Sequence, residues 1–314
     1  MKFLVSRLSE EEMAALRRAA PGVEILTART REEALALVPE ADALYGHIQP
    51  EIIRAGRKLR WAQAGSAGVE RFLFPEIRES DITLTNARNV YGPAMADHTM
   101  AFILAFARGL PTYVRRQVEG RWEKSPAVPS FDLEGRTLLI AGLGSIGREL
   151  APRAAAFGVR VIATRKRAED PTPGVEAVHP PSELRRLLPE ADFVAVCVAL
   201  TPETRHLFGA EEFRLMKPTA YLTNVTRGAV LDQEALVAAL QAGEIAGAGL
   251  DVTDPEPLPP GHVLWSMENV ILTPHTSGRG PGSRRRMWEV VCENLRRFAA
   301  GEPLLNVVDK EAGY

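Results

Sequence analysis

The stretch Gly142-Leu143-Gly144-Ser145-Ile146-Gly147 follows a run of apolar and small residues at 137–141 and precedes a helical pattern at 148–157. A strand, a tight glycine turn and a helix in this order open a doubly wound parallel sheet of the Rossmann type. Unpaired N–H groups at the start of such a helix favour an anion, above all the pyrophosphate of a dinucleotide. The chain is therefore predicted to contain a dinucleotide-binding domain.

Each glycine of this turn has its own expected task. Gly142 permits the tight turn, Gly144 lets the pyrophosphate approach the backbone, and Gly147 lets helix and strand pack closely. Ser145 and Ile146 offer backbone contacts to the pyrophosphate. The alternative interpretation is a strand–helix turn that binds nothing.

Short apolar runs alternate with helical patterns along the whole chain, which is typical of parallel sheets covered by helices. A length of 314 residues suits two domains. Ser9 and Glu12 have the spacing of a capping box at a helix start. Strands are expected in a smaller first domain at 2–5, 23–26, 43–45, 59–64 and 82–85, and in the nucleotide-binding domain at 137–141, 159–163, 193–198, 221–225, 247–251 and 270–272.

Composition gives no reason to expect nucleic acid or membrane as a partner. The formal net charge is −2, and no segment approaches the ~18 unbroken apolar residues of a membrane helix. The two cysteines, Cys197 and Cys292, suit a reducing compartment better than a disulfide framework. We expect a cytoplasmic protein, and no metal site is predicted.

The end of the second strand of the nucleotide-binding domain bears on the choice of dinucleotide. An acidic residue there would hold the ribose hydroxyls of NAD. This chain has Ala163-Thr164-Arg165-Lys166-Arg167 instead. Arg165 can bind a 2′-phosphate through two hydrogen bonds, so NADP is predicted over NAD, which remains possible. A solvated basic loop is the alternative.

Three further motifs follow the glycine turn in the sequence. They are Thr226-Arg227-Gly228, Asp254-Pro255-Glu256-Pro257 and Thr273-Pro274-His275. A guanidinium can hold a 2-keto acid, and an imidazole backed by a carboxylate can move a proton. Each motif alone is weak, but together with a hydride-carrying dinucleotide they indicate a reductase of 2-keto acids.

On these motifs the chain resembles the D-isomer-specific 2-hydroxyacid dehydrogenase family, and most closely its glyoxylate/hydroxypyruvate reductase-type members. The resemblance covers nearly the whole chain. The matching stretches are Gly65-Ser66-Ala67-Gly68-Val69, the glycine turn, Thr201-Pro202-Glu203-Thr204, and residues 224–232, 249–257 and 273–278.

The resemblance implies a role for each member of the catalytic set. Arg227 would bind the substrate carboxylate and carbonyl oxygen, and His275 would donate a proton to the keto oxygen during reduction. Glu256 would hold the imidazole in place and favour its charged form. The implied reaction reduces glyoxylate or hydroxypyruvate with NADPH to a D-2-hydroxy acid.

The resemblance also implies further binding residues. Asp251 would contact the nicotinamide carboxamide, with a strand-end cap as the alternative. Thr204 would lie at the cofactor, or else cap the next helix. The backbone N–H groups of the loop at Ser66, Ala67 and Gly68 would hold the substrate carboxylate, unless this is an ordinary tight connection. The remaining residues assigned to the cofactor are Val198, Ala199, Val225, Thr226 and Ser277.

The resemblance finally implies the domain organisation. A flavodoxin-like α/β substrate domain would comprise residues 1–92 and 283–314, and residues 93–282 would form the Rossmann-type domain with a hinge. The apolar helical stretch after Pro93 should be buried between domains or subunits, which favours a homodimer. Two other functions remain open: a dinucleotide-sensing interaction protein of the same fold, and a phosphoglycerate, formate or phosphite dehydrogenase.

Overall fold

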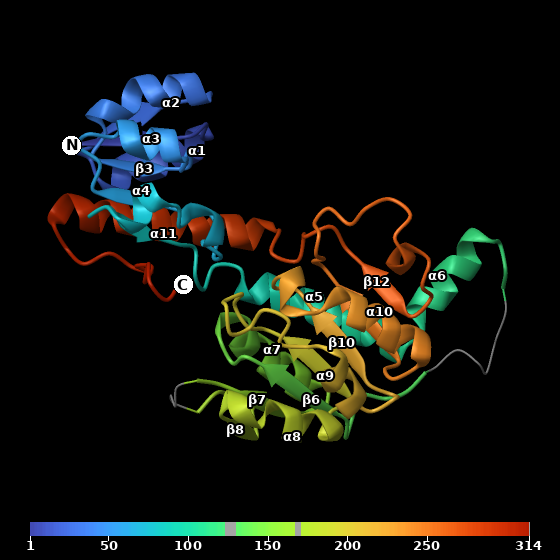
Figure 1. Cartoon of the computed structure of the whole chain (residues 1–314). Helices are drawn as coiled ribbons and strands as arrows, with labels where there is room; N and C mark the ends of the chain where they lie inside the picture. Colours follow the sequence, from blue (N-terminus) through green and yellow to red (C-terminus); the bar gives the residue numbers. More distant parts are fainter. Residues whose placement is uncertain (123–129, 167–170, 314) are drawn as a thin grey trace. The chain divides into compact units, whose positions relative to one another are not determined.

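The computed structural model describes residues 1–122, 130–166 and 171–313. The chain forms two compact units (Figure 1). Unit 1 comprises Met1–Tyr91 and Gly280–Tyr314, and unit 2 comprises Gly92–Arg279. The substrate-binding and nucleotide-binding roles of these two parts of the chain stay predictions.

Unit 1 contains a parallel sheet whose strand order is β2-β1-β3-β4-β5 among the described residues. This is the flavodoxin-like order, in which the chain reverses direction across the sheet after its second strand. The strands are β1 (Lys2–Val5), β2 (Glu24–Thr27), β3 (Ala43–Tyr45), β4 (Trp61–Gln63) and β5 (Thr83–Thr85).

Helices cover both faces of this sheet. Successive strand residues point to opposite sides, so each strand contributes side chains to the core on either face. Phe3 faces a cluster with Leu16 of α1 and Val291 of α11, whereas Leu4 faces a second cluster with Ile52 of α3 and Ile77 of α4. The helices of unit 1 are α1 (Glu10–Ala19), α2 (Arg31–Leu37), α3 (Pro50–Ala55), α4 (Pro75–Arg78) and α11 (Pro281–Ala300). A helix from the end of the chain thus completes the core of the first unit.

Unit 2 contains a parallel sheet with the order β12-β11-β10-β9-β6-β7-β8 among the described residues. The order reverses between β6 and β9, and ligands of such sheets bind beyond the strand ends at this point. The strands are β6 (Thr137–Ala141), β7 (Arg160–Thr164), β8 (Ala177–His179), β9 (Phe193–Val196), β10 (Tyr221–Asn224), β11 (Gly247–Leu250) and β12 (Val270–Leu272).

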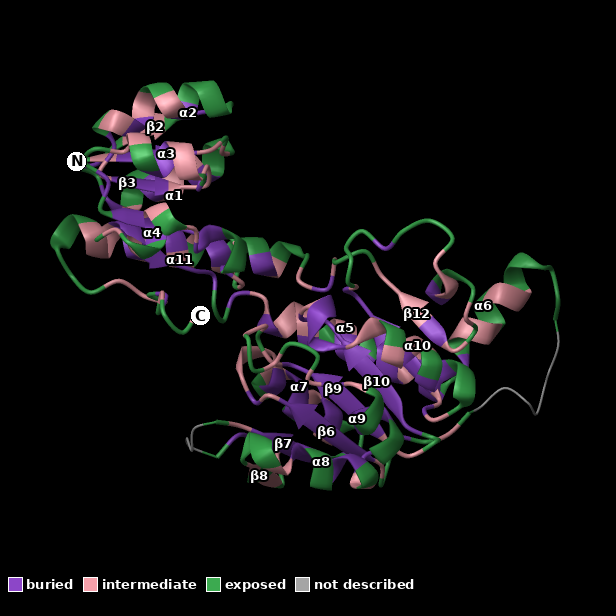
Figure 2. Cartoon of the chain, viewed as in Figure 1, coloured by how far each residue is buried: buried purple, intermediate pink, exposed green. Residues whose placement is uncertain are grey.

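The two faces of the unit 2 sheet have separate cores. On one face Ile140 packs with Phe102 of α5 and Leu150 of α7; on the other Leu139 packs with Phe213 of α9 and residues of α8 and α10. Figure 2 shows these buried strands in purple between the helices. The helices are α5 (Gly92–Ala107), α6 (Leu110–Val118), α7 (Ser145–Ala156), α8 (Leu184–Leu187), α9 (Ala210–Leu215) and α10 (Gln233–Ala242).

The predicted α/β class and both parallel sheets are confirmed. The capping box at Ser9 is also present, since Ser9 Oγ accepts from Glu12 N–H and the Glu12 carboxylate accepts from Ser9 N–H. The prediction of six strands in the nucleotide-binding domain was incomplete. It missed β8, a short edge strand whose residues are only partly buried and therefore lack an apolar run.

Several predicted bounds were wrong by a few residues. Strands β9, β10 and β11 end at Val196, Asn224 and Leu250, so the residues that follow them are free to turn into loops. Helix α7 begins at Ser145, three residues before the prediction, with Gly144 as its N-cap. The buried side chains of α5 pack inside unit 2, and the expected burial of this helix between domains or subunits stays a prediction. In the described parts of the chain, no helix has both the length and the apolar character to span a bilayer.

Candidate active site

The candidate catalytic residues follow three neighbouring strands of unit 2. Arg227 lies after β10, Glu256 after β11 and His275 after β12. The sheet order places these strands side by side, and their parallel direction brings all three carboxyl ends to one edge. Residues far apart in the sequence are therefore gathered by the sheet, as is usual for sites of this fold.

His275 and Glu256 form a direct pair. The distance from His275 Nδ1 to Glu256 Oε1 is 2.6 Å, and the side chains are 44% and 42% exposed. His275 has a φ of +52°, an uncommon conformation for a non-glycine residue. With Glu256 ionised, the shared proton lies on Nδ1, so Nε2 is the atom that can exchange a proton with a bound molecule.

A buried carboxylate holds the loop that carries His275. Asp251 is 1% exposed and accepts hydrogen bonds from Thr273 Oγ1 at 2.6 Å and from the N–H groups of Thr276 and Ser277, each at 2.8 Å. Its backbone oxygen accepts from His275 N–H at 2.8 Å. Burial alone would raise the pKa of Asp251, but these hydrogen bonds outweigh it and keep the pKa below its ordinary value. This arrangement supports the strand-end cap that the sequence left open.

Arg227 lies in a second tightly bound loop. The buried Asn224 side chain accepts from Thr226 N–H and Thr226 Oγ1, each at 3.0 Å, and donates to Arg227 O at 2.9 Å. A Cβ on Gly228 would lie 2.1 Å from the Thr253 backbone. Only glycine permits this approach, so the Arg227 loop is held against the loop that leads to Glu256.

The three glycines of the turn at 142–147 differ in the space around them. A Cβ on Gly142, whose φ is +102°, would lie 2.7 Å from Val198 Cγ1, and one on Gly147 would lie 2.8 Å from Gly142 O. A Cβ on Gly144 would meet nothing within 4 Å. Gly142 and Gly147 are thus needed for packing, whereas Gly144 leaves open space at the N-terminus of α7, where Ser145 and Ile146 begin the helix.

The end of β7 supports this turn. Thr164 is buried, its Oγ1 accepts from Gly142 N–H at 3.2 Å, and its carbonyl accepts from Leu143 N–H at 2.9 Å. The Thr164 side chain thus stabilises the turn. Arg165 is half-buried and Lys166 is exposed directly after the strand, while Arg167 lies outside the described residues.

The other residues assigned to the cofactor lie beyond β9, β10 and β12. Thr204 Oγ1 donates to Ala199 O at 2.6 Å and accepts from Thr201 N–H at 2.8 Å, so it closes a turn. The alternative that it caps a helix is wrong, because α9 has Gly209 as its N-cap. Val198 is half-buried and Ala199 exposed; buried neighbours of the site are Val225, Thr226 and Ser277.

Comparison with known proteins identifies the family of this chain. Residues 100–277 match the family model described as D-isomer specific 2-hydroxyacid dehydrogenase, NAD binding domain. A glyoxylate reductase of Korarchaeum cryptofilum is 39% identical over 284 residues, which are 87% of this chain and 84% of that protein. The chain belongs to the D-isomer specific 2-hydroxyacid dehydrogenase family.

Solved structures support the same family. A D-isomer specific 2-hydroxyacid dehydrogenase family protein of Aeromonas salmonicida superposes with a TM-score of 0.88 and 33% identity, over 98% of this chain and 99% of that one. An NADPH-dependent glyoxylate/hydroxypyruvate reductase of Sinorhizobium meliloti, solved with NADP and sulfate, has a TM-score of 0.84 and 27% identity, over 100% and 99% of the two chains. As a family member, the chain is an NAD(P)-dependent oxidoreductase.

The loop assigned to the substrate of this dehydrogenase lies in unit 1, directly after β4. Ala67 is exposed there, and Ser66 and Gly68 are half-buried. Among the residues that the structure describes, none accepts a hydrogen bond from the N–H groups of these three residues. The loop can therefore offer N–H groups to a ligand.

Sequence reasoning missed two residues that support the candidate site in unit 2. Asn224 appeared only as part of a motif, although its position at the end of a buried strand was a usable signal. His98 lies in none of the motifs from which the site was predicted. Its Nε2 lies 3.0 Å from Thr273 Oγ1 and 3.9 Å from Asp251 Oδ1, so it belongs to the network behind His275.

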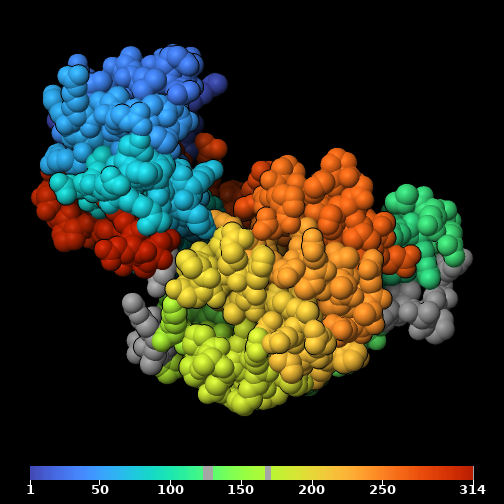
Figure 3. Space-filling view, in the orientation of Figure 1, coloured from blue at the N-terminus to red at the C-terminus, as the bar shows by residue number. Residues whose placement is uncertain are grey.

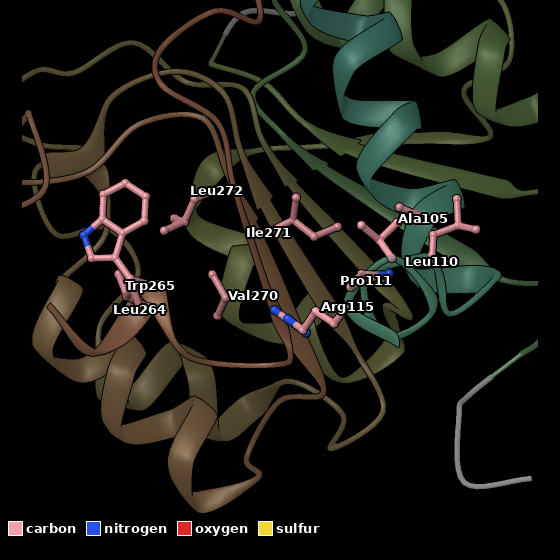
Figure 4. Close-up of a pocket in the computed structure, with 10 residues that line it drawn as sticks. Ala105, Leu110, Pro111, Arg115, Leu264, Trp265, Val270, Ile271 and Leu272 are labelled. Atoms are coloured by element: carbon pink, nitrogen blue, oxygen red, sulfur yellow. The ribbon is translucent and has the colours of Figure 1, made fainter. Parts of the chain in front are cut away.

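A cavity of about 420 Å³ lies elsewhere in unit 2 (Figure 4). Side chains from α6, β12 and the 3₁₀ turn Val263–Trp265 line it, and most of them are apolar. None of the predicted site residues lines this cavity. It is not the candidate active site.

We expect Asp251→Asn to destabilise the dehydrogenase at neutral pH by roughly 2–3 kcal/mol, because an amide cannot accept from all of the donors that Asp251 binds. The lowered pKa means that the stabilisation is present above the ordinary pKa of an aspartate and is lost as the pH falls through the lower folded value. Urea unfolding at pH 7 and pH 3 measures both effects.

Asp254→Asn is the matched control, since the Asp254 side chain is 47% exposed and its ion pair with Arg205 spans 3.9 Å. It should change stability by less than about 0.5 kcal/mol. A difference between Asp251→Asn and the parent that is as large at pH 3 as at pH 7 would contradict the role given to the carboxylate.

Proposed function

We propose that this dehydrogenase reduces small 2-keto acids of the glyoxylate and hydroxypyruvate type to D-2-hydroxy acids, with NADPH as the preferred cofactor. The observation that carries the proposal is the His275–Glu256 pair at 2.6 Å, on the sheet edge that also carries Arg227. The relatives named as glyoxylate reductases support this choice of substrate.

The catalytic residues have complementary tasks. The Arg227 guanidinium binds the carboxylate and polarises the keto oxygen of the substrate. His275 gives the proton on Nε2 to that oxygen during reduction and takes it back in the reverse direction. Glu256 holds Nδ1 and stabilises the charged imidazole. The N–H groups of residues 66–68 bind the substrate carboxylate.

The dinucleotide fits the space left open at Gly144. The first N–H groups of α7, including those of Ser145 and Ile146, would hold its pyrophosphate, and a side chain at Gly144 would fill that space. When bound, the nicotinamide supplies the hydride for the keto carbon. Val198, Thr226 and Ser277 lie beyond the strand ends of the same sheet and would border the dinucleotide.

The preference for NADPH rests on the end of β7. The last residue of this strand, Thr164, and the two residues after it, Arg165 and Lys166, carry no carboxylate. Two cations here favour a 2′-phosphate, which a carboxylate would repel. The NADPH-dependent enzyme of Sinorhizobium meliloti supports the same assignment.

We further propose that the protein forms a homodimer through α6. This helix has no buried residue, and Leu110, Val114 and Val118 form an apolar row at 48%, 56% and 86% exposure. Trp122 follows at 97% exposure. In Figure 3 the side chains of α6, in green, lie at the surface of unit 2. A continuous apolar row of this kind is expected to be covered by another surface, here the same row on a second copy.

For catalysis, we expect the purified protein to oxidise NADPH with glyoxylate or hydroxypyruvate, and His275→Gln to lower kcat by about 10²–10⁴-fold, because the general acid is lost. Nicotinamide absorbance measures both. His262→Gln is the control, since His262 only caps a 3₁₀ turn through Leu264 N–H at 3.3 Å. Dinucleotide binding without turnover on any 2-keto acid would instead favour a sensing protein.

For the cofactor, we expect Arg165→Ala to raise the KM for NADPH roughly tenfold or more, with the KM for NADH changed by less than about twofold, because a charge-assisted contact to the 2′-phosphate is lost. Parallel kinetics with both cofactors test this. Arg185→Ala, on an exposed guanidinium paired with Glu211 and Glu212, is the control. An equal effect on both cofactors would count against the phosphate contact.

For assembly, we expect sedimentation at micromolar concentration to give twice the mass of one chain, and Val114→Glu to give a monomer because it places a charge in the apolar row. Val178→Glu is the matched control, since Val178 is 48% exposed on the edge strand β8. A monomeric parent protein would refute the homodimer.

A further inference from the structure

The loop after β4 has an unusual pattern of hydrogen bonds within unit 1. Five successive carbonyl oxygens, those of residues 64–68, each accept a hydrogen bond. The donors are Gln63 Nε2 to Ala64 O at 2.9 Å, Tyr91 Oη to Gly65 O, Ala87 N–H to Ser66 O at 3.0 Å, Asn86 Nδ2 to Ala67 O at 2.8 Å, and Ser66 Oγ to Gly68 O at 2.7 Å.

The N–H groups of residues 66–68, unlike the carbonyl oxygens, have no hydrogen-bond partner among the described residues. Each peptide group is planar, so fixing its carbonyl on one side fixes the N–H of the next residue on the other side. The capped carbonyl of Gly65 therefore sets the direction of Ser66 N–H, and that of Ala67 sets the direction of Gly68 N–H.

Two of the side chains that cap these carbonyls, Asn86 and Gln63, are themselves held by further hydrogen bonds. Asn86 is 5% exposed; its Oδ1 accepts from Arg88 N–H at 3.1 Å, so its Nδ2 is the atom that faces Ala67 O. Gln63 is fully buried, and its Oε1 accepts from Thr85 Oγ1 at 2.8 Å and Asn294 Nδ2 at 2.9 Å. The donors thus have one orientation that satisfies their partners.

We propose that Asn86 and Tyr91 are positioning residues, which keep the N–H groups of residues 66–68 directed at the carboxylate of the substrate. The inference rests on the proposed function and deepens it. Without a cap, the peptide between Gly65 and Ser66, or between Ala67 and Gly68, can rotate and turn a carbonyl oxygen toward the anion. A carboxylate repels such an oxygen, whereas it accepts hydrogen bonds from N–H groups.

A purely structural role for these caps makes a different prediction. Loss of a hydrogen bond that only stabilises unit 1 lowers the free energy of unfolding. It can reduce the folded fraction and hence the apparent kcat, but it leaves the KM of the folded enzyme unchanged. Loss of a cap that positions the loop acts on the affinity for carboxylates, because the dinucleotide motif lies in unit 2. The two roles separate when substrate and dinucleotide affinities are measured on the same variants.

The experiment uses Asn86→Ala and Tyr91→Phe in the full chain. We expect each to raise the KM for glyoxylate or hydroxypyruvate roughly tenfold or more. Without its cap, the loop loses a hydrogen bond from one N–H group to the charged carboxylate of the substrate. The Kd for oxalate, a dicarboxylate that needs no turnover to bind, should rise by a similar factor. The kcat and the Kd for NADPH should stay within about twofold.

Tyr221→Phe is the matched control, because it also removes one tyrosine hydroxyl but from the core of unit 2. Its KM and oxalate Kd should equal those of the parent. Folded variants of Asn86 and Tyr91 with an unchanged KM and oxalate Kd would overturn the inference. So would a parallel decline of kcat, NADPH affinity and substrate affinity that follows the loss of thermal stability.

Failure of the proposed function itself would be visible separately. The parent protein would then show no turnover on any 2-keto acid with either dinucleotide. Calorimetry with oxalate still compares the parent with the two variants in that case. Oxalate binding by the parent that both variants retain would overturn the positioning role, and weaker binding by both would support it.

Discussion

The buried carboxylate of Asp251 is the interaction on which the rest of the unit 2 site depends. It binds donors of Thr273, Thr276 and Ser277 together, and thereby fixes the loop in which His275 takes a left-handed conformation. A carboxylate without water must receive hydrogen bonds, so its burial makes the loop conformation nearly obligatory. The buried Asp251 thus holds in place the loop that carries His275, whose pair with Glu256 is partly exposed.

The same design recurs at other strand ends of the protein. Asn224 binds the loop after β10, Thr164 binds the turn after β6, and Asn86 binds the loop after β4. Each side chain satisfies backbone groups that the sheet leaves unpaired at its carboxyl edge. At the loop after β4 the polar side chains take up carbonyl oxygens, whereas the N–H groups of residues 66–68 donate to no described residue. The contacts that hold the backbone of this loop in place therefore also leave its N–H groups able to bind a ligand.

Much of the fold could be predicted because its signals are local. The apolar runs placed the strands within a few residues, and Ser9 with Glu12 located a helix start. The strand β8 was missed because an edge strand with partly buried residues has no distinctive pattern. The apolar sequence of α5 predicted burial, and its buried side chains pack against α7 and β10 in its own unit. An apolar helix sequence predicts burial and does not say against what.

By itself, the sequence determined the class of fold, the glycine turn and the residue types of the candidate catalytic set, because each of these is encoded in a short stretch. Only the tertiary structure decided which polar side chains act as supports. Asn294 reaches Gln63 across 231 positions, and His98 reaches Thr273 across 175. No local spacing encodes such contacts, since they exist only after the sheets have formed and brought the partners together. Likewise, only the folded structure shows that the N–H groups of residues 66–68 donate to no acceptor in the described parts of the chain.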